Sequence, residues 1–289
     1  GPGSNPMANI SLRFASSSDR ELVSALMTGA ELRHVHLDWV PVLDLIEDPL
    51  FLIASRNDLP QACLAAPPDP PPLAWIRLFA VANKSRLDPL WDSLWVELQK
   101  AAASQGVELI YSLALHPWFE PLLMRSGFEQ SNEVIFYEWS GSAGVLERDR
   151  SLSIRRIKSS DLPQIAEIDH DAFAPAWQNS LRTLSTARKL STYATVSEVA
   201  GVPVGYQIST ASALGAHLAR LAVREDYQHR GIGRALVVDM LKHVNRRGFD
   251  RVTVNTQADN LNSQHLYNSL GFEPTGQRYR MYACSIRSG

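Results

Sequence analysis

Hydrophobic and polar positions alternate along the second half of the chain in a pattern that predicts short strands interrupted by helices. The pattern predicts strands at 152–157, 193–198, 203–210, 217–223, 251–256 and 279–286. It predicts a helix that opens at Ser160-Asp161 and further helices at 234–245 and 263–269. Gly201 suits a hairpin turn, while Gly248 and Gly271 suit helix ends, because glycine adopts a left-handed backbone readily. This mixture indicates an α/β (α+β) fold.

Two stretches interrupt the patterning. The proline-rich segment 67–72 can continue neither a helix nor a central strand, so we expect a surface loop there. Residues 140–144 are small and polar, and a charged run follows them before the alternation resumes. We therefore expect two domains, 7–140 and 151–289. Residues 1–4 look like the remnant of a removed tag, so the native chain is expected to begin near Met7.

The two halves share landmarks that indicate duplication. Segment 74–81 aligns with 216–223 at an offset of 142 residues, and the spacing from each segment to the next glycine helix stop is the same. Further on, Ser-Gly-Phe at 126–128 aligns with Leu-Gly-Phe at 270–272, at an offset of 144. Strand–helix–strand units are common, so chance similarity is the alternative. Three landmarks in register favour duplication.

Composition and charge narrow the class of protein. The 289 residues suffice for two domains that each bury a core. With 28 Lys plus Arg against 30 Asp plus Glu, the chain lacks the basic excess typical of nucleic-acid-binding proteins. No apolar run reaches the roughly 20 residues of a membrane span. Two cysteines, Cys63 and Cys284, indicate neither a disulfide framework nor a cysteine zinc site. We expect a cytoplasmic protein without nucleic-acid, membrane or metal partners; no pattern indicates its oligomeric state.

A glycine-containing loop between the predicted strand 217–223 and the predicted helix 234–245 carries the candidate chemistry. It reads Gln228-His229-Arg230-Gly231-Ile232-Gly233 and is followed by Arg234. Helix N-termini bind phosphate because their first N–H groups lack intrahelical partners and the helix dipole is positive there. Side chains at the two glycines would block a pyrophosphate, whereas Arg230 and Arg234 add positive charge. Such a loop alone is usually only a turn, so its flanking strand and helix carry the argument.

This loop resembles the signature of the GNAT superfamily of acetyltransferases, in which Gln or Arg, two residues, Gly, one residue and Gly or Ala lie between a strand and a helix. The run from Asn260 to Phe272 also matches the family pattern, and the resemblance covers nearly all of 151–286. Asp171-Ala172-Phe173, with Pro175 and Trp177, is similar to the ribosomal-protein alanine N-acetyltransferases. Together with the duplication, the resemblance implies two tandem GNAT-like domains. Each would be a mixed, mostly antiparallel, twisted sheet flanked by helices.

By the same alignment the first half is a degenerate copy without a phosphate loop. Arg86, Pro89 and Trp91 stand at the positions of the glutamine and the two glycines. Proline lacks an N–H and tryptophan is bulky, so this backbone could neither donate nor be approached closely. His116 and Leu123 stand where the downstream run has its first asparagine and its tyrosine. A second tryptophan four residues after Trp91 favours a helix face in the core. We hypothesise that this half packs against the active domain and shapes its acceptor groove.

The resemblance implies acetyl-CoA as the cosubstrate and assigns roles to individual residues. Backbone groups of Leu221, Ala222 and Val223 would pair with the pantetheine arm like an added strand. The loop from Gln228 to Arg234 would hold the phosphates, and Asn260 would contact the cofactor. Tyr267 would give a proton to the departing thiolate, as a phenol with a pKa of about 10 can. The alternative for Tyr267 is a core aromatic on a short helix.

The residues leave the general base open. In the alanine N-acetyltransferases a glutamate twelve residues before the tyrosine serves as base, and here that position is Asn255, which cannot take a proton. His217 lies eleven residues before Gln228, where histone acetyltransferases carry a glutamate. An imidazole with a pKa of about 6.5 is mostly neutral at pH 7. An ordinary strand histidine and a water relay are the alternatives.

The expected function is that of an N-acetyltransferase, an acyl-CoA N-acyltransferase that moves acetyl from acetyl-CoA to a primary amine by direct attack. At pH 7 an α-amino group, with a pKa of about 8, is neutral far more often than a lysine near 10.4. Expected acceptors are a peptide N-terminus or a small amine, such as an amino acid, a polyamine or an antibiotic. The alternative is a non-catalytic CoA-binding sensor or interaction module. Tyr267 favours the enzyme, and Asn255 favours the module.

Overall fold

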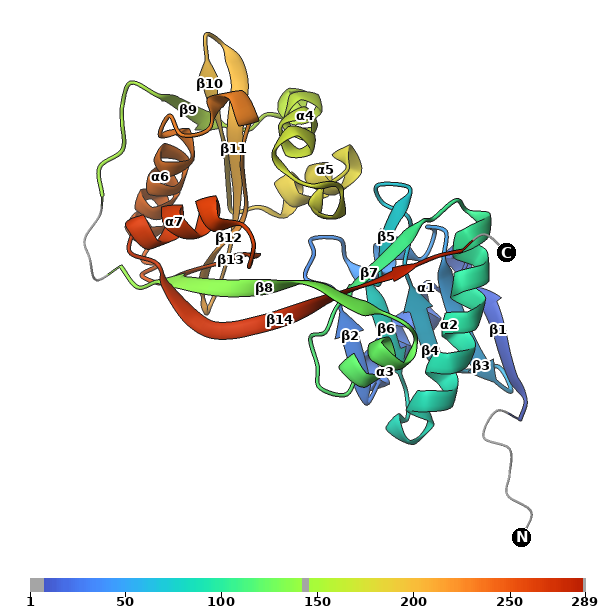
Figure 1. Cartoon of the computed structure of the whole chain (residues 1–289). Coiled ribbons are helices and arrows are strands. Elements are labelled where there is room, and N and C mark those ends of the chain that lie inside the picture. Colours follow the sequence, from blue (N-terminus) through green and yellow to red (C-terminus); the bar gives the residue numbers. More distant parts are fainter. Residues whose placement is uncertain (1–7, 142–145, 288–289) are drawn as a thin grey trace. The chain divides into compact units, whose positions relative to one another are not determined.

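The chain folds as two compact units. The computed structural model describes residues 8–141 and 146–287 (Figure 1). Unit 1 comprises Gly1–Ser131 and Arg280–Gly289, and unit 2 comprises Asn132–Tyr279. The expected tag remnant, the native start near Met7 and residues 142–145 lie outside the described residues. Within the described ranges, no helix is long and apolar enough to cross a membrane, and no group of His, Cys, Asp and Glu side chains could hold a metal ion.

Unit 1 places a sheet between two helices. Its elements in chain order are β1 (Ile10–Phe14), η1 (Ser17–Asp19), α1 (Arg20–Gly29), β2 (Leu32–Val35), η2 (Val42–Leu45), β3 (Phe51–Arg56), β4 (Leu59–Ala65), β5 (Leu73–Trp75), β6 (Leu78–Val81), η3 (Lys84–Arg86), α2 (Leu87–Ser104), β7 (Leu109–Leu113), α3 (Glu120–Arg125), the start of β8 (Glu129–Trp139) and the end of β14 (Glu273–Ser285). The strands pair as β1-β3-β4-β6-β2 and as β5-β7-β14. Side chains alternate across β4: Cys63 packs with Leu26 of α1, and Leu64 packs with Leu94 of α2.

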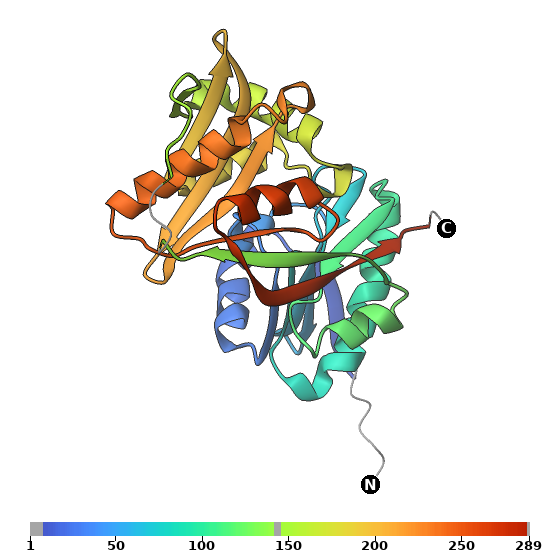
Figure 2. The ribbon, with the colours of Figure 1, turned by 60° about the vertical axis from the view of Figure 1, so that its left-hand side comes forward.

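Unit 2 holds a longer sheet, also covered on both faces. Its elements are the rest of β8, β9 (Ser153–Arg156), η4 (Ser159–Asp161), α4 (Leu162–Ala172), η5 (Pro175–Trp177), α5 (Leu181–Leu190), β10 (Tyr193–Val199), β11 (Val202–Ser212), β12 (Gly215–Val223), η6 (Glu225–Tyr227), α6 (Ile232–Arg246), β13 (Val252–Gln257), α7 (Leu261–Ser269) and the start of β14. The strands pair as β14-β8-β13-β12-β11-β10-β9. Figure 2 shows α6 across one face of β10–β12, and α4 with α5 lies on the other.

The elements predicted for the second half are present. β10 and β11 form the predicted hairpin around Gly201, whose φ of +78° is left-handed. α6 ends as predicted before Gly248, where the N–H of Phe249 reaches back to the carbonyl of Val244 (3.0 Å). Two features differ from the prediction. β14 begins at Glu273 rather than 279, and α5 is absent from the predicted elements.

The strand pairing of the two units repeats at the predicted offset. In unit 1, β5 runs parallel to β7 with Ala74 opposite Ile110. In unit 2, β12 runs parallel to β13 with Ala216 opposite Val252. Each residue of the second pair lies 142 positions after its counterpart in the first. The alignment of 74–81 with 216–223 is thus an alignment of structure as well as of sequence.

A bidentate ion pair repeats at the same offset. In unit 1 Arg13 donates to both carboxylate oxygens of Asp19 (2.7 and 2.6 Å), and in unit 2 Arg155 does the same to Asp161 (2.8 and 2.9 Å). Each aspartate also accepts the N–H of the residue three positions earlier (2.8 and 2.7 Å). This contact lies far from the segments used to infer duplication, so it supports the tandem architecture independently.

Each unit receives its last strand from the other half of the chain. In unit 2, β8 pairs antiparallel with β13, with Trp139 opposite Val252. In unit 1, β14 pairs antiparallel with β7, with Cys284 opposite Ile110. These two partner residues are equivalent by the repeat, so the exchanged strands fill the same place in their sheets.

Because of this exchange, the residue bounds of the two units differ from those of the expected domains, 7–140 and 151–289. Residues 132–139 belong to unit 2 and residues 280–289 to unit 1. Hydrophobic alternation predicts a strand at each end, but it does not say which strand is its partner.

Unit 1 has a helix where unit 2 has its glycine loop. Pro89 lies in the first turn of α2, where a missing N–H is tolerated, and Trp91 is fully buried. The Trp91 ring stacks on that of Trp95, with 5.6 Å between centroids and 4° between planes. The predicted core face is confirmed.

Candidate functional site

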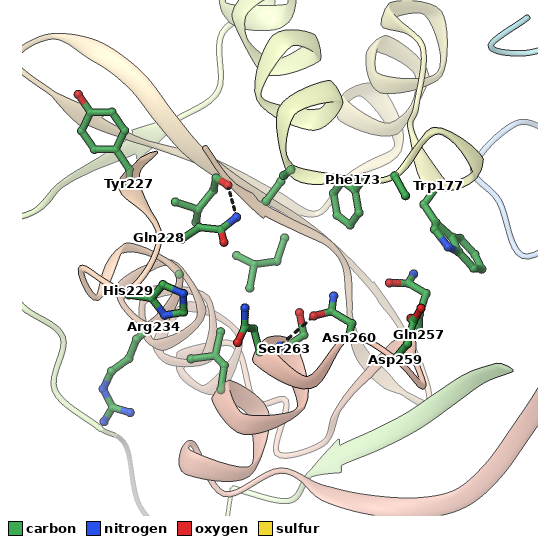
Figure 3. A pocket seen from close by; sticks show the side chains of 18 of the residues that line it. Phe173, Trp177, Tyr227, Gln228, His229, Arg234, Gln257, Asp259, Asn260 and Ser263 are labelled. Atoms are coloured by element: carbon green, nitrogen blue, oxygen red, sulfur yellow. Dashed lines mark hydrogen bonds between the residues drawn. The ribbon is translucent and has the colours of Figure 1, made fainter. Parts of the chain in front are cut away.

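A cavity of about 490 Å³ opens in unit 2 where the carboxyl end of β12 meets the amino ends of α6 and α7 (Figure 3). The segment that follows α4 forms the opposite wall. A cavity of this size suits a small molecule or the arm of a cofactor. Its lining residues are Ala172, Phe173, Ala174, Trp177, Leu221, Ala222, Val223, Tyr227, Gln228, His229, Gly231, Gly233, Arg234, Gln257, Asp259, Asn260, Asn262, Ser263 and Leu266.

The loop between β12 and α6 presents a helix N-terminus to this cavity. Gly231 caps α6 with φ +81° and ψ 5°, and a Cβ there would meet nothing within 4 Å. The left-handed conformation, rather than crowding inside the protein, therefore calls for glycine. The first intrahelical bond runs from the N–H of Ala235 to the carbonyl of Gly231, so the N–H groups before it point out of the helix end. The amide of Gln228 donates to the carbonyl of Val223 (3.0 Å) and ties the loop to the strand.

Most of the predicted loop residues line the cavity, but Arg230 and Ile232 do not. Ile232 is 2% exposed and packs with Val204 and Leu236 in the core. The guanidinium of Arg230 lies over the ring of Tyr227, 4.9 Å from its centroid. A contact of these two side chains with a cofactor in the cavity is therefore not supported, and a role for their backbone N–H groups stays a prediction.

The edge of β12 beside the loop is open. β13 pairs with β12 only over residues 216–218, whereas β11 stays paired with it as far as Val223. Beyond Leu218 the two parallel strands diverge, and the predicted residues Leu221, Ala222 and Val223 line the cavity. An extended ligand can add to such an edge as another strand would.

A buried ion pair lies beneath the opposite wall. Arg220 of β12 donates two hydrogen bonds to the carboxylate of Asp169 on α4 (2.9 and 3.0 Å), and the Tyr206 hydroxyl donates to the same carboxylate (2.5 Å). The guanidinium also lies 3.6 Å from the ring centroid of Phe173 and donates to the carbonyl of Trp177 (2.5 Å). The Asp169 side chain is fully buried, and that of Arg220 is 12% exposed. Burial and the adjacent carboxylate raise the pKa of Tyr206 well above its usual range.

Sequence reasoning missed this ion pair, although a signal was available. Arg220 interrupts the apolar run of the predicted strand 217–223, and Asp169 lies four residues after Ile165 on the buried face of a helix. A charge within a buried stripe needs a buried partner. The other lining residues without a predicted role are Ala172, Phe173, Ala174, Trp177, Tyr227, Gln257, Asp259, Asn262, Ser263 and Leu266. Ser263 and Leu266 belong to the run that matches the family pattern, and Phe173 and Trp177 to the segment similar to the alanine N-acetyltransferases.

Asn260 lines the cavity and also caps α7. Its side-chain oxygen accepts the N–H of Ser263 (3.1 Å), as the residue before a helix often does. An amide carries two N–H donors besides this oxygen, so Asn260 can serve the helix and a ligand together. The predicted contact with a cofactor is compatible with this position.

Tyr267 lies in the core rather than in the cavity wall. Its side chain is 4% exposed, and its ring centroid lies 5.5 Å from that of Phe272 and 6.3 Å from that of Tyr137. Burial raises the pKa of its hydroxyl, so the phenol stays protonated at neutral pH. The core-aromatic alternative describes these surroundings, and the role of Tyr267 as proton donor stays a prediction.

His217 lies on β12 but does not line the cavity. Its Nδ1 is 2.8 Å from the hydroxyl of Thr253 on β13. Burial lowers the pKa of the imidazole below its ordinary value of 6.5, so His217 is neutral at pH 7. A neutral imidazole can accept a proton, and its role as general base stays a prediction.

The segment that contains most of this cavity's lining is similar to known proteins. The model described as "Acetyltransferase (GNAT) family" matches residues 162–272. The ribosomal protein bS18 alanine N-acetyltransferase of Escherichia coli (strain K12) is 26% identical over 130 residues, which cover 45% of this chain and 86% of that relative.

Two solved structures resemble the chain along nearly its whole length. The GCN5-related N-acetyltransferase from Sphaerobacter thermophilus has a TM-score of 0.64 at 15% identity and covers 98% of this chain and 97% of its own. A tandem GNAT protein from the clavulanic acid biosynthesis pathway has a TM-score of 0.67 at 14% identity and covers 97% and 99%. At these identities the likeness shows the fold alone. The chain thus has the fold of a tandem GNAT protein, and its residues 162–272 match the model of the acetyltransferase (GNAT) family.

Proposed function

We propose that unit 2 binds acetyl-CoA in this cavity and transfers the acetyl group to a primary amine by direct attack of the amine on the thioester. The observation that carries the proposal is the meeting of an open strand edge with the N-terminus of α6 in one cavity. Residues 221–223 offer backbone groups to the amide-bearing pantetheine arm. The first N–H groups of α6, with Arg234 beside them, suit the pyrophosphate.

The reaction needs a neutral amine, a base that takes one proton from the amine and an acid that gives one proton to the departing thiolate. The amine nitrogen bonds to the thioester carbon as the carbon–sulfur bond breaks; the amine gives up a proton and the thiolate takes one. We assign the second proton transfer to Tyr267, and the first to His217 or to a water relay. A peptide α-amino group is the leading acceptor, because it is neutral at pH 7 far more often than a lysine. The name of the Escherichia coli relative, an alanine N-acetyltransferase of a ribosomal protein, agrees with this choice. A small amine is the second choice.

Calorimetric titration with acetyl-CoA tests the cofactor site directly. The wild-type protein should bind acetyl-CoA, and a folded Gly231→Trp variant should not, because an indole at this lining position would fill the approach to the helix end. No binding by the folded wild-type protein would overturn the proposal.

Thiol release across a panel of peptides and small amines tests the transfer step. The Tyr267→Phe variant should lose kcat while its affinity for acetyl-CoA changes little. The His217→Gln variant should lose the acidic limb of the pH–rate profile if His217 is the base. Because its pKa is lowered, that limb should lie below pH 6.5 in the wild-type protein.

A non-catalytic CoA-binding module is the second candidate. The burial of Tyr267 and the amide at Asn255, where the alanine N-acetyltransferases carry their base, favour it. Tight acetyl-CoA binding without thiol release over the whole panel would support the module and overturn the transferase.

A further inference from the structure

Unit 1 shows how the open edge of a GNAT-like sheet can be closed by the protein itself. β2 pairs antiparallel with β6, with Leu32 opposite Val81 and Val35 opposite Leu78. At the offset of 142, β6 corresponds to the part of β12 that lines the cavity of unit 2. In unit 1 a segment of the chain therefore takes the place along the strand that the proposed function gives to pantetheine in unit 2.

The segment that closes this edge has a counterpart in unit 2. β2 follows α1, and 174–177 follow α4 at the same offset. Residues 174–177 form no strand with β12, because they include the turn η5. Two of them, Ala174 and Trp177, line the cavity from the side opposite the edge. The two units have thus placed equivalent segments differently, one on the edge and one across a cavity from it.

The side chain of Arg220 links β12 to the segment 174–177. Its guanidinium donates to the carbonyl of Trp177 (2.5 Å). The counterparts of these two residues in unit 1, Leu78 and Val35, are direct neighbours across a strand pair. A long charged side chain in unit 2 thus stands where unit 1 has strand-to-strand pairing.

The partners of Arg220 are polar in unit 2 and apolar in unit 1. At the offset of 142, Asp169 corresponds to Met27 and Arg220 to Leu78. Tyr206 lies opposite Ala222, as Cys63 lies opposite the equivalent Ala80, so strand pairing matches Tyr206 to Cys63. The three unit 1 counterparts pack in one apolar cluster beneath α1.

We infer that the Asp169–Arg220 ion pair, with Tyr206, is a positioning device that holds 174–177 away from β12 and keeps the cofactor edge open. To close as unit 1 does, unit 2 would have to move the Arg220 guanidinium and leave a buried carboxylate unpaired, which is costly. With apolar residues at these positions, this obstacle is absent. The inference rests on the proposed use of this edge by acetyl-CoA.

A double variant that installs the unit 1 residues, Asp169→Met with Arg220→Leu, tests the device. Replacing both partners of a buried pair by apolar residues of similar size is often neutral or stabilising, so this variant is expected to fold. Backbone amides of 221–223 should exchange with deuterium more slowly than in the wild-type protein, because residues 174–177 would close on β12 and cover them. Acetyl-CoA should bind at least roughly tenfold more weakly, as expected if the open form falls to about a tenth of the population.

The control removes a second bidentate pair of unit 2, Arg155→Leu with Asp161→Leu. It should lower stability without changing acetyl-CoA affinity or exchange at 221–223. Arg220→Lys, which keeps a cation for Asp169, should recover part of the affinity lost in the double variant.

Unchanged exchange and unchanged affinity in the folded double variant would overturn the inference, while leaving the proposed function intact. If the wild-type protein itself does not bind acetyl-CoA, the proposed function fails and the exchange measurement decides the inference alone. Should the double variant not fold, Asp169→Asn with Arg220→Gln replaces it. These neutral amides can hydrogen-bond to each other without leaving a buried charge unpaired, and the glutamine is too short to reach Trp177. Wild-type exchange and affinity in this variant would equally overturn the inference.

Discussion

Two glycines with the same backbone conformation stand at opposite ends of α6. Gly231 has φ +81° and Gly248 has φ +90°, and a Cβ at either would meet nothing within 4 Å. A left-handed conformation costs a non-glycine residue about 1 kcal/mol or more. Of these two glycines, only Gly231 lines the cavity.

Comparing variants of these two glycines distinguishes the effect of backbone strain on stability from an effect on ligand binding. Gly231→Ala and Gly248→Ala should each lower the free energy of unfolding by about 1 kcal/mol. Only Gly231→Ala should also weaken acetyl-CoA binding, because Gly231 lines the cavity and Gly248 does not. Denaturant unfolding and calorimetric titration measure the two effects. Equal acetyl-CoA affinity in both variants would show that Gly231 is needed for the fold of the loop alone.

At the residue scale, the sequence predicts the positions where backbone geometry restricts the residue type. The pattern predicts Gly231 and Gly233 at a helix end that a ligand would approach closely, and both glycines line the cavity. Tyr267 is different, since a helix as short as α7 has too little periodicity to say which way one ring points. Its counterpart in unit 1, Leu123, is fully buried, which agrees with a core position.

At the scale of elements, α7 depends on its cap. Asn260→Asp keeps an oxygen for the N–H of Ser263 but removes the amide donors and adds a negative charge. We expect its free energy of unfolding to stay near that of the wild-type protein, because a carboxylate at a helix N-terminus is favourable. Its affinity for acetyl-CoA should fall, because the donors are gone and the ligand is anionic.

Asn260→Ala is the matched comparison, since it removes the cap as well. It should lose about 1 kcal/mol of unfolding free energy in addition to affinity. Thermal unfolding with titration of both variants tests this division. An Asp variant that binds acetyl-CoA as tightly as the wild-type protein would exclude Asn260 from cofactor contact.

β2 gives unit 1 a dependence on pH. Burial lowers the pKa of His34 from 6.5 to about 4, although its Nε2 contacts the carbonyl of Ile76 (3.2 Å). As pH falls through 6.5 the unfolded chain takes up a proton that the folded protein does not accept until about pH 4. The free energy of unfolding should therefore fall by about 3 kcal/mol over this window, at about 1.4 kcal/mol per pH unit.

Urea unfolding between pH 7 and pH 4 measures this contribution. The His34→Leu variant should show a shallower loss of stability than the wild-type protein, whereas the exposed His170→Leu variant should show the same loss. Parallel slopes for the wild-type protein and His34→Leu would mean that His34 does not titrate differently in the folded state.

Local patterning predicts elements better than partners. The hairpin of β10 and β11 and the helix α6 follow from alternation and glycine stops, which are properties of neighbouring residues. Sequence alternation at 279–286 predicts a strand but holds no information that its partner is β7. The same limit applies to Asp169 and Arg220, whose contact joins residues far apart in the chain.

At the scale of the whole molecule, the two units share one arrangement of strands but differ at one strand edge. Both units keep the strand register of the repeat and its bidentate Arg–Asp pair, so this arrangement is common to both. They differ along the edge of β6 and of the equivalent end of β12: β2 covers this edge in unit 1, and the edge lines a cavity in unit 2. The unit that has a helix in place of the glycine loop is also the unit whose strand edge is closed, which agrees with the proposal that acetyl-CoA binds to unit 2.

The strand exchange decides how unit 2 can be isolated. A fragment of residues 146–289, cut at the apparent linker, lacks β8 and leaves β13 without its antiparallel partner. It also lacks Tyr137 and Trp139, which are 4% and 2% exposed in the core beneath α6. Losing a buried aromatic typically costs about 3–5 kcal/mol, comparable with the total stability of a domain. We expect this fragment to be unfolded or aggregated by circular dichroism.

A fragment of residues 132–279, which is unit 2 itself, keeps β8 and is the matched control. It should fold and bind acetyl-CoA, because the cavity lining lies wholly within it. A folded 146–289 fragment would contradict the structural importance of the exchange.

Comparing turnover of 132–279 with that of the full chain then tests the hypothesis that the first half shapes the acceptor groove. Equal kcat/KM for the same amine would mean that unit 1 contributes nothing to acceptor recognition, whereas equal acetyl-CoA affinity with a raised KM for the amine would support that role.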